Sequence, residues 1–175
     1  MTTNADSTTR SLIQSYIDDH PGVHFNELVR DLNVATGQAQ YHIHRLLRAS
    51  HIDERSLYGK THYFPPTYSR WEQGALALAR RETSREIVFY LLEHDEVPPA
   101  DIVDDLHIAR STLEWHVSRL IDQDIAMKHR KSDGTVRLAL VDRERIVELL
   151  STVTPRAHDQ LADRFMKFVD ALFDY

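Results

Sequence analysis

The side chains best suited to recognition chemistry lie on two segments that begin near Thr36 and Arg110. Glutamine can bond adenine, and arginine guanine, through paired hydrogen bonds, and arginine also binds phosphate. On the outward face of a helix, such side chains suit base edges in the DNA major groove. The candidates are Thr36, Gln38, Gln40, Tyr41, His44, Arg45 and Arg48 in the first segment, and Arg110, Ser111, Thr112, Trp115, Ser118 and Arg119 in the second. The alternative is a solvated polar helix face.

Glu114 sets the second segment apart from the first. A carboxylate repels phosphate, although it can accept a hydrogen bond from cytosine. We therefore expect the two segments to be unequal partners, and we favour the first for base readout.

Basic residues also follow each segment, in stretches that we expect to form β-hairpins. They are Arg55, Lys60 and His62 after the first segment, and Lys128, His129, Arg130, Lys131 and Arg137 after the second. Charges on a hairpin beside a recognition helix commonly hold phosphate, which fixes register more than sequence. The alternative is a strand edge that charge protects from aggregation.

The net charge of −6 by itself opposes nucleic-acid binding, because phosphate contacts need Lys and Arg. The distribution of the charge matters more. Residues 36–64 hold four basic and two acidic residues, residues 109–138 hold six and four, and acid is concentrated between Glu93 and Asp105. Both candidate surfaces are therefore locally positive.

An internal repeat positions the two segments. A shift of 74 positions aligns residues 10–64 with 84–138 without a gap, and the identities fall at the spacing of core positions. Identical pairs include Ile13/Ile87, Tyr16/Tyr90, His20/His94, Asp31/Asp105, His42/His116, Arg45/Arg119 and Leu46/Leu120. This pattern predicts that the chain contains two copies of the same fold.

The sequence of each copy of the repeat predicts three helices followed by a β-hairpin. The apolar spacing indicates helices over 8–19, 26–32 and 37–49, and again over 84–94, 99–106 and 111–123. Thr36 and the Arg110-Ser111 pair are the expected N-caps of the third helices. Hairpins are expected over 52–64 and over 126–141, where Asp133-Gly134 favours a tight turn.

The fold class is therefore mainly α with small β-hairpin wings, as two tandem winged helix-turn-helix domains. The expected boundaries are 7–65 for the first domain, 66–82 for a helical linker, 83–141 for the second domain and 142–175 for C-terminal helices. Within these limits, we expect helices over 68–82, 143–152 and 156–173.

Three stretches of this sequence resemble the tandem winged helix-turn-helix transcription regulators of haloarchaea: TGQAQYHIHRL, LYGKTHYFP and ARSTLEWHVSRL. The resemblance covers nearly the whole chain and implies DNA binding and transcriptional control. A bias toward arginine and aspartate also resembles proteins of salt-loving archaea. The third-helix pattern is similar to that of ArsR-type and MarR-type regulators, but the chain departs from metal-sensing ArsR-type members because it has no cysteine.

Enzyme chemistry has no support in the sequence. The absence of cysteine excludes a disulfide framework, a thiolate zinc site and a cysteine nucleophile. Gly-rich phosphate loops, nucleophile elbows and paired-carboxylate motifs are also missing, so we expect no enzyme, cofactor or metal site. His42 and His116 recur with the repeat and are expected to be partly buried packing residues.

The C-terminal segment predicts an amphipathic helix. Its apolar stripe consists of Leu161, Phe165, Phe168, Val169 and Leu172. Pairing of this stripe would form a homodimer suited to a pseudo-palindromic site on double-stranded DNA, whereas the alternative is packing against the chain's own second domain. A pocket between the domains could take a small-molecule effector, but no polar cluster identifies one.

No segment approaches the roughly twenty apolar residues that span a bilayer, so we expect a cytoplasmic protein without membrane contact. An alternative function is a tandem winged-helix protein-interaction module, such as a chromosome-segregation scaffold, which the acidic stretch would suit. The locally positive segments and the family resemblance favour DNA binding.

Overall fold

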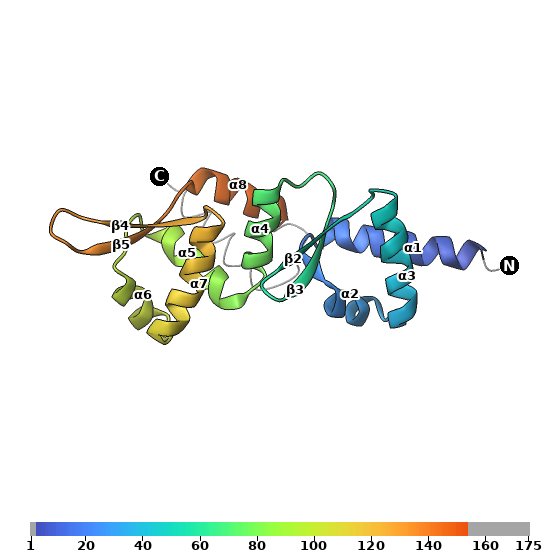
Figure 1. The fold of residues 1–175 in the computed structure, drawn as a ribbon, viewed down its shortest axis with the longest axis horizontal. Coiled ribbons are helices and arrows are strands. Elements are labelled where there is room, and N and C mark those ends of the chain that lie inside the picture. The colour runs from blue at the N-terminus through green and yellow to red at the C-terminus, as the bar shows by residue number, and fades with distance from the viewer. Residues whose placement is uncertain (1–2, 154–175) are drawn as a thin grey trace. The chain divides into compact units, whose positions relative to one another are not determined.

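The computed structural model describes residues 3–153. The chain divides between Gln73 and Gly74 into two compact units, called the first unit and the second unit. Each is mainly helical and carries a small antiparallel sheet (Figure 1). The structure thus confirms the predicted fold class of two similar units in tandem.

The first unit places three helices around a three-stranded sheet of order β1-β3-β2. Its elements are α1 (Thr3–Asp19), β1 (Val23–His24), α2 (Phe25–Leu32), α3 (Thr36–Arg48), β2 (Asp53–Leu57) and β3 (Lys60–Phe64). Strands β2 and β3 form the hairpin called the first wing.

The second unit repeats this order, with a single bridge between Val97 and Leu138 in place of β1, and adds a helix at its end. Its elements are α5 (Glu82–Glu93), α6 (Pro99–Asp105), α7 (Arg110–Asp122), β4 (Ala126–Arg130), β5 (Val136–Leu140) and α8 (Arg143–Val153). Strands β4 and β5 form the second wing. Helix α4 (Arg70–Ala79) lies in the predicted linker and contains the point at which the chain divides.

Left-handed backbone residues close the turns at matching positions of the repeat. Asn33 and His107 (φ 49° and 52°) follow the second helix of each unit, and Ser50 and Asp124 (φ 56° and 53°) follow the third. Such residues are uncommon outside glycine, because the β-carbon crowds the backbone, and asparagine and aspartate tolerate the conformation best. Their recurrence shows that the two turns have the same geometry in both units.

Both wings turn where the sequence predicted, although the lengths of the turns differ from the prediction. In the first, Leu57 pairs with Lys60, so Tyr58 and Gly59 alone make the turn, both at positive φ. That combination is the hairpin turn whose twist matches the flanking strands. In the second, Gly134 lies at φ 84° and the Asp133 carboxylate accepts a hydrogen bond from the Thr135 amide at 2.8 Å.

Two local predictions were wrong. The N-caps of α3 and α7 are Ala35 and Ala109, without a side-chain cap, because the helices begin one residue earlier than expected. Strand β1 was missed. It has only two residues, and it forms because Val23 and His24 pair with β3, a contact between segments about 40 residues apart in sequence.

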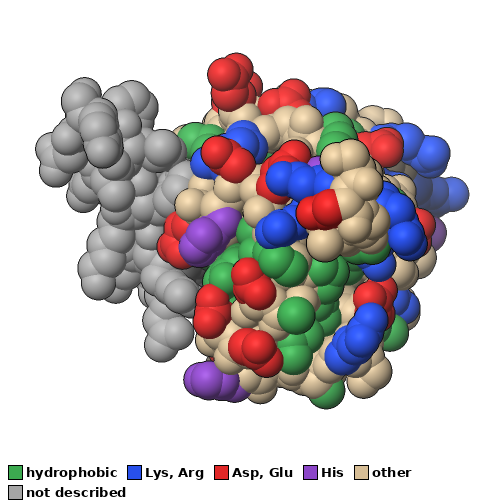
Figure 2. Space-filling model, turned by 90° about the vertical axis from the view of Figure 1, so that its left-hand side faces the viewer, with side chains coloured by type: hydrophobic (Ala, Val, Ile, Leu, Met, Phe, Trp, Pro, Cys, Tyr) green, Lys and Arg blue, Asp and Glu red, His purple; other side chains and the backbone are tan. Residues whose placement is uncertain are grey.

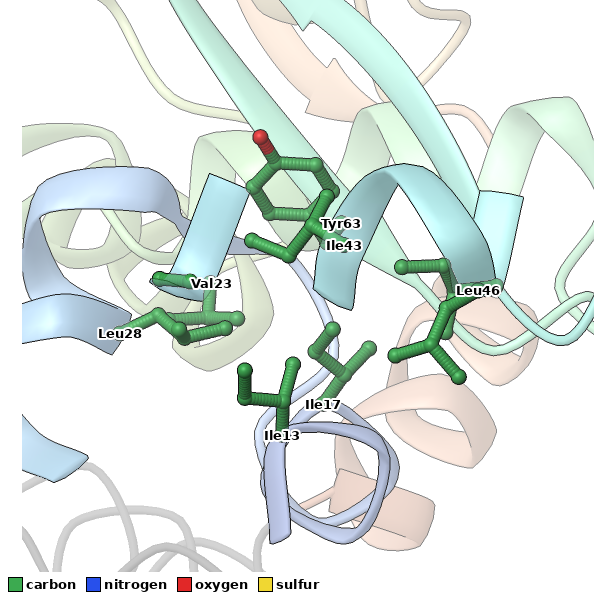
Figure 3. Close-up of a cluster of buried hydrophobic side chains, with 9 residues drawn as sticks. Ile13, Ile17, Val23, Leu28, Ile43, Leu46 and Tyr63 are labelled. Carbon is green, nitrogen blue, oxygen red and sulfur yellow. The ribbon is translucent and has the colours of Figure 1, made fainter. Parts of the chain in front are cut away.

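The core of the first unit collects apolar side chains from every layer (Figure 3). Ile13 and Ile17 of α1 meet Leu28 of α2, and Ile43 and Leu46 of α3 close the cluster. All five side chains are at most 4% exposed. Burying each contributes about 1.5–3 kcal/mol, which fixes α3 with its polar face outward.

The second unit buries the matching face of α7, through Leu113, Val117 and Leu120, as predicted. Arg143 at the start of α8 donates to the carbonyl of Leu92 at 2.5 Å and contacts Asp95 at 2.8 Å. Helix α8 is thereby attached to the end of α5. The helix predicted over 156–173 lies outside the described residues.

Candidate nucleic-acid interface

The outward face of α3 is polar and free of carboxylates. Every residue predicted there is exposed, namely Thr36, Gln38, Gln40, Tyr41, His44, Arg45 and Arg48. Their exposure follows from the burial of Ala39, Ile43 and Leu46 on the opposite face. The arrangement gives α3 amide, phenol, imidazole and guanidinium groups with no negative charge among them.

Tyr41 and Arg45 form a pair one helical turn apart. The Arg45 Nη1 atom donates to the Tyr41 hydroxyl at 3.0 Å, and its guanidinium carbon lies 5.7 Å from the ring centroid. Contacts of this kind restrict the arginine rotamers before any ligand arrives. The remaining N–H groups of Arg45 are thus partly preorganised for an acceptor.

A groove of about 770 Å³ runs between α3 and the first wing. Its lining comprises His24, Phe25, Asn26, Gln40, Tyr41, Ile43, His44, Leu47, Glu54, Gly59, Lys60, Thr61 and Tyr63. Burial, and to a lesser extent the charge of Glu54, raise the pKa of Tyr63 above its usual range, so this phenol stays neutral at physiological pH. The groove therefore combines an apolar floor with exposed polar groups from the helix and the wing.

The first wing presents fewer basic groups than predicted. Lys60 is exposed, and its ammonium lies 3.2 Å from the His24 Nε2 atom. Arg55 instead donates to the carbonyl of Arg70 at 2.5 Å and is half-buried. His62 is 2% exposed, with Nδ1 2.6 Å from the carbonyl of Gly22, so its expected place on the surface was wrong.

The outward face of α7 differs in its charge. Arg110, Ser111, Trp115 and Ser118 are exposed, whereas Thr112, Glu114 and Arg119 are half-buried. The Glu114 carboxylate pairs with the ammonium of Lys128 at 2.9 Å. This ion pair connects the helix to the second wing, so the predicted phosphate ligand Lys128 already contacts an acid of its own unit.

A second acidic residue, Glu96, pairs with basic groups of the same wing. Glu96 lies 2.7 Å from the Lys131 ammonium and 3.1 Å from the His129 ring. The hydrogen bond from Lys131 is the main reason why the pKa of Glu96 is lowered. Arg130 is exposed and Arg137 is half-buried. Figure 2, which looks onto the end of Figure 1 that carries this wing, shows Lys and Arg interspersed with Asp and Glu.

The paired histidines pack within their units. His42 is fully buried, with its ring 5.1 Å from that of Tyr41. His116 is half-buried, and its Nδ1 atom lies 2.7 Å from the hydroxyl of Ser84. Among the described residues, no group of three or more His, Asp or Glu side chains is arranged to hold a metal ion.

Sequence reasoning missed Arg81, which precedes α5. Its guanidinium carbon lies 5.5 Å from the centroid of the Trp115 ring. Periodicity could not reveal this contact, because Arg81 and Trp115 are 34 positions apart in the chain. The only available signal was the unusual run Arg80-Arg81 at the end of the predicted linker.

The fold and the two polar third-helix faces define a protein with two winged helix-turn-helix units. A family model described as an N-terminal HTH domain matches residues 7–76. A second, described as winged helix-turn-helix DNA-binding, matches residues 80–126. Both parts of the chain are thus similar to helix-turn-helix domains, and the model that matches the second part is described as DNA-binding.

Comparison with individual proteins points the same way. An uncharacterized HTH-type transcriptional regulator of Methanocaldococcus jannaschii is 28% identical over 129 residues, which are 72% of this chain and 31% of that protein. The chain thus spans about a third of the length of this archaeal relative. The solved structure of a mutant of Lactococcus lactis ZitR has 18% identity and a TM-score of 0.34, covering 78% of this chain and 91% of that one. At this sequence identity and TM-score, the similarity supports no conclusion about this chain.

No described helix is long and apolar enough to cross a membrane.

Proposed function

We propose that this chain is a transcription regulator that binds promoter DNA, with α3 in the major groove and the wings on the phosphate backbone. The observation that carries the proposal is the exposed, carboxylate-free face of α3 beside the groove of the first wing. Matches to helix-turn-helix family models over both units support it, the second of them described as DNA-binding. So does the description of the archaeal relative as a transcriptional regulator.

The residues divide by role. Gln38, Gln40 and Arg45 contact bases, because amide and guanidinium groups read base edges. The DNA phosphates are contacted by Arg48, Lys60, Arg110, Arg130 and Arg137. Lys128 and Lys131 contribute less, because their ammonium groups already pair with acidic side chains. The protein-interaction alternative is not favoured, since the family matched by the second unit is described as DNA-binding and the archaeal relative as a transcriptional regulator.

We further propose that the chain is a cytoplasmic, non-enzymatic protein with the domain boundaries predicted above. It acts as a homodimer through Leu161, Phe165, Phe168, Val169 and Leu172, which lie outside the described residues. A dimer would match the two-fold symmetry of a pseudo-palindromic site, so that two first units occupy two half-sites.

The test maps the genomic occupancy of a tagged chain and then measures binding to the DNA sequence recovered. Replacing Gln38, Gln40 and Arg45 together by alanine should abolish the promoter peaks. Specific affinity should fall roughly 100-fold or more, because each base contact contributes about 1–3 kcal/mol. The same titration counts chains per duplex, and two chains would support the dimer.

A matched control replaces Ser11, Ser15 and Arg30, which are exposed residues of α1 and α2, by alanine. It removes one positive charge, as the test variant does, and should leave the peaks in place. Equal occupancy of the α3 variant and the wild type would refute base readout by α3.

A further inference from the structure

Two arginines of the second unit gather at one exposed aromatic ring. The guanidinium carbons of Arg119 and Arg81 lie 3.3 Å and 5.5 Å from the centroid of Trp115, which is 40% exposed. Arg119 comes from the same helix, one turn after Trp115, whereas Arg81 comes from the residue before α5. Tertiary packing thus builds a cationic cluster at the surface.

The cluster restrains the arginines before any ligand binds. Arg119 Nη1 donates to the carbonyl of Trp115 at 2.7 Å, and its planar guanidinium stacks on the indole. A stacked guanidinium is weakly hydrated and still directs N–H groups outward along its edge. The Arg81 guanidinium lies farther from the same ring, and two guanidinium groups near one ring suit an oxyanion that accepts several hydrogen bonds, as phosphate does.

The pKa of the neighbouring His116 is sensitive to the positive charges of Arg81 and Arg119. His116 packs edge-on against Trp115, with ring centroids 4.6 Å apart, and its Nδ1 atom lies 2.7 Å from the Ser84 hydroxyl. The pKa of His116 is lowered, first by burial and then by the positive charges of Arg81 and Arg119. The positive charges of Arg81 and Arg119 therefore both disfavour protonation of His116.

We propose that Arg81 and Arg119, held at Trp115, together bind one phosphate group of the DNA backbone. This inference rests on the proposed function and assigns the second unit a backbone contact, while base readout stays with the first. DNA is the favoured source of the phosphate because Trp115, which both half-buried arginines approach, is exposed on α7 together with Arg110 and Ser111. A free phosphorylated molecule is the other source that the test separates.

Proton uptake should accompany binding. A bound phosphate offsets the charges of Arg81 and Arg119, so the pKa of His116 should rise toward its usual value. The groups that face this histidine are those two arginines, the Ser84 hydroxyl and the Trp115 ring. Because the bound state holds the proton more tightly, the contact should strengthen as the pH falls through the range in which His116 titrates.

The first experiment measures DNA affinity of the full chain against salt concentration. The double variant Arg81→Gln/Arg119→Gln should lower the magnitude of the log–log slope by about 0.9, the value for one phosphate. The loss should be equal for all DNA sequences. A control with the same loss of charge, Arg30→Gln/Arg145→Gln, should retain the slope.

Two results of this experiment would overturn the inference. A decrease in slope about twice as large would mean that the two arginines contact separate phosphates. An unchanged slope, in a variant whose thermal melting shows that it is folded, would mean that the cluster does not face DNA. If the α3 variant loses specific binding in the latter case, the proposed function stands and this inference alone fails.

A second experiment follows the pKa of His116 by NMR and does not depend on affinity. In the free chain, Arg81→Gln should raise this pKa, since it removes one repelling charge. A DNA duplex should raise the pKa in the wild type and leave it nearly unchanged in Arg81→Gln. A rise with inorganic phosphate but none with the duplex would assign the cluster to a free phosphorylated ligand and refute the backbone contact.

Discussion

The two units share a backbone plan but differ in the space between the third helix and the wing. The 74-residue shift aligns Gln40 with Glu114 and Glu54 with Lys128. In the second unit, the aligned acid and base form an ion pair of 2.9 Å from α7 to β4. In the first, Gln40 and Glu54 line an open groove of about 770 Å³. Two aligned positions thus form an ion pair in one unit and line an open groove in the other.

Other repeated contacts are the same in both units. Tyr16 donates to Asp31 at 2.7 Å, and Tyr90 donates to Asp105 at 2.5 Å. Each tyrosine ring also lies close to that of the histidine one turn later, with ring centroids 4.3 Å apart for His20 and 4.4 Å for His94. Contacts that hold the first and second helices together therefore persist, while groups at the helix–wing cleft diverge. This division is expected if the cleft, and not the core, carries the functional difference.

The largest effect should come from the shared core. Leu46→Ala and Leu120→Ala remove the same buried side chain at aligned positions, where the exposed fractions are 1% and 0%. Each should cost about 2–5 kcal/mol, because the lost methyl groups leave a cavity. Urea unfolding followed by residue-specific hydrogen exchange measures the cost within the unit that carries the change. A cost below about 1 kcal/mol in only one unit would mean that the two cores are not equivalent.

An intermediate effect should follow from exchanging the cleft residues. Gln40→Glu/Glu54→Lys places the pair of the second unit into the first and should lower specific DNA affinity about tenfold or more, since the base contact of Gln40 is replaced by a carboxylate on the face of α3. Glu114→Gln releases Lys128 and should increase the magnitude of the salt slope by about 0.9. Both are measured by fluorescence titration of labelled duplexes.

The control for this exchange is Glu148→Gln, an exposed change on α8 with the same net change of one charge. It should alter neither affinity nor slope. If Gln40→Glu/Glu54→Lys binds as the wild type does, the open groove of the first unit is not part of the DNA contact, and the contrast between the units loses its functional meaning.

The smallest effect should come from the tyrosine–aspartate bonds. Tyr16→Phe and Tyr90→Phe should each cost less than about 1 kcal/mol, because these bonds are solvent-exposed. The hydrogen bond from Tyr16, followed by that from Arg30, lowers the pKa of Asp31, so its stabilisation is present above the usual aspartate range and is lost as the pH falls through the lowered pKa. NMR titration should show this pKa rising in Tyr16→Phe.

The matching hydrogen bond in the second unit, from Tyr90 to Asp105, affects a titration at high pH. The hydrogen bond to Asp105 is the main cause that raises the pKa of Tyr90 to about 12. Its stabilisation is therefore complete below the usual tyrosine pKa of about 10 and is lost as the pH rises through about 12. Ultraviolet titration of the wild type and of Tyr90→Phe should separate the late titration of Tyr90 from that of Tyr63, whose pKa is also raised, and Asp105→Asn should move the Tyr90 titration to lower pH. A Tyr90 titration that stays at high pH in Asp105→Asn would mean that Asp105 is not what raises the pKa.

The repeat and the apolar spacing predicted most of the fold. Ala39, Ile43 and Leu46 recur at helical intervals, so the buried and exposed faces of α3 could be assigned before the structure. Asp133-Gly134 likewise marked the turn of the second wing. Strand β1 escaped prediction because two residues show no periodicity, and their pairing partner lies far along the chain.

Candidate residues were predicted less completely than elements. Residue type and helical position placed Gln38, Gln40 and Arg45 on an exposed face. They could not show that Arg55 donates to the carbonyl of Arg70, or that His62 is buried against Gly22. Those two outcomes depend on which backbone atoms the folded chain brings near each side chain.

The sequence by itself thus determined two similar helical units and the polar face of each third helix, because local periodicity and turn chemistry act over a few residues. Tertiary structure alone decided which charges remain available. Glu114 reaches Lys128 across a cleft, Glu96 reaches the tip of a wing, and Arg81 reaches Trp115 from another helix. Coulombic and stacking energies depend on distance in space, and distance in space between remote residues is set only when the chain has folded.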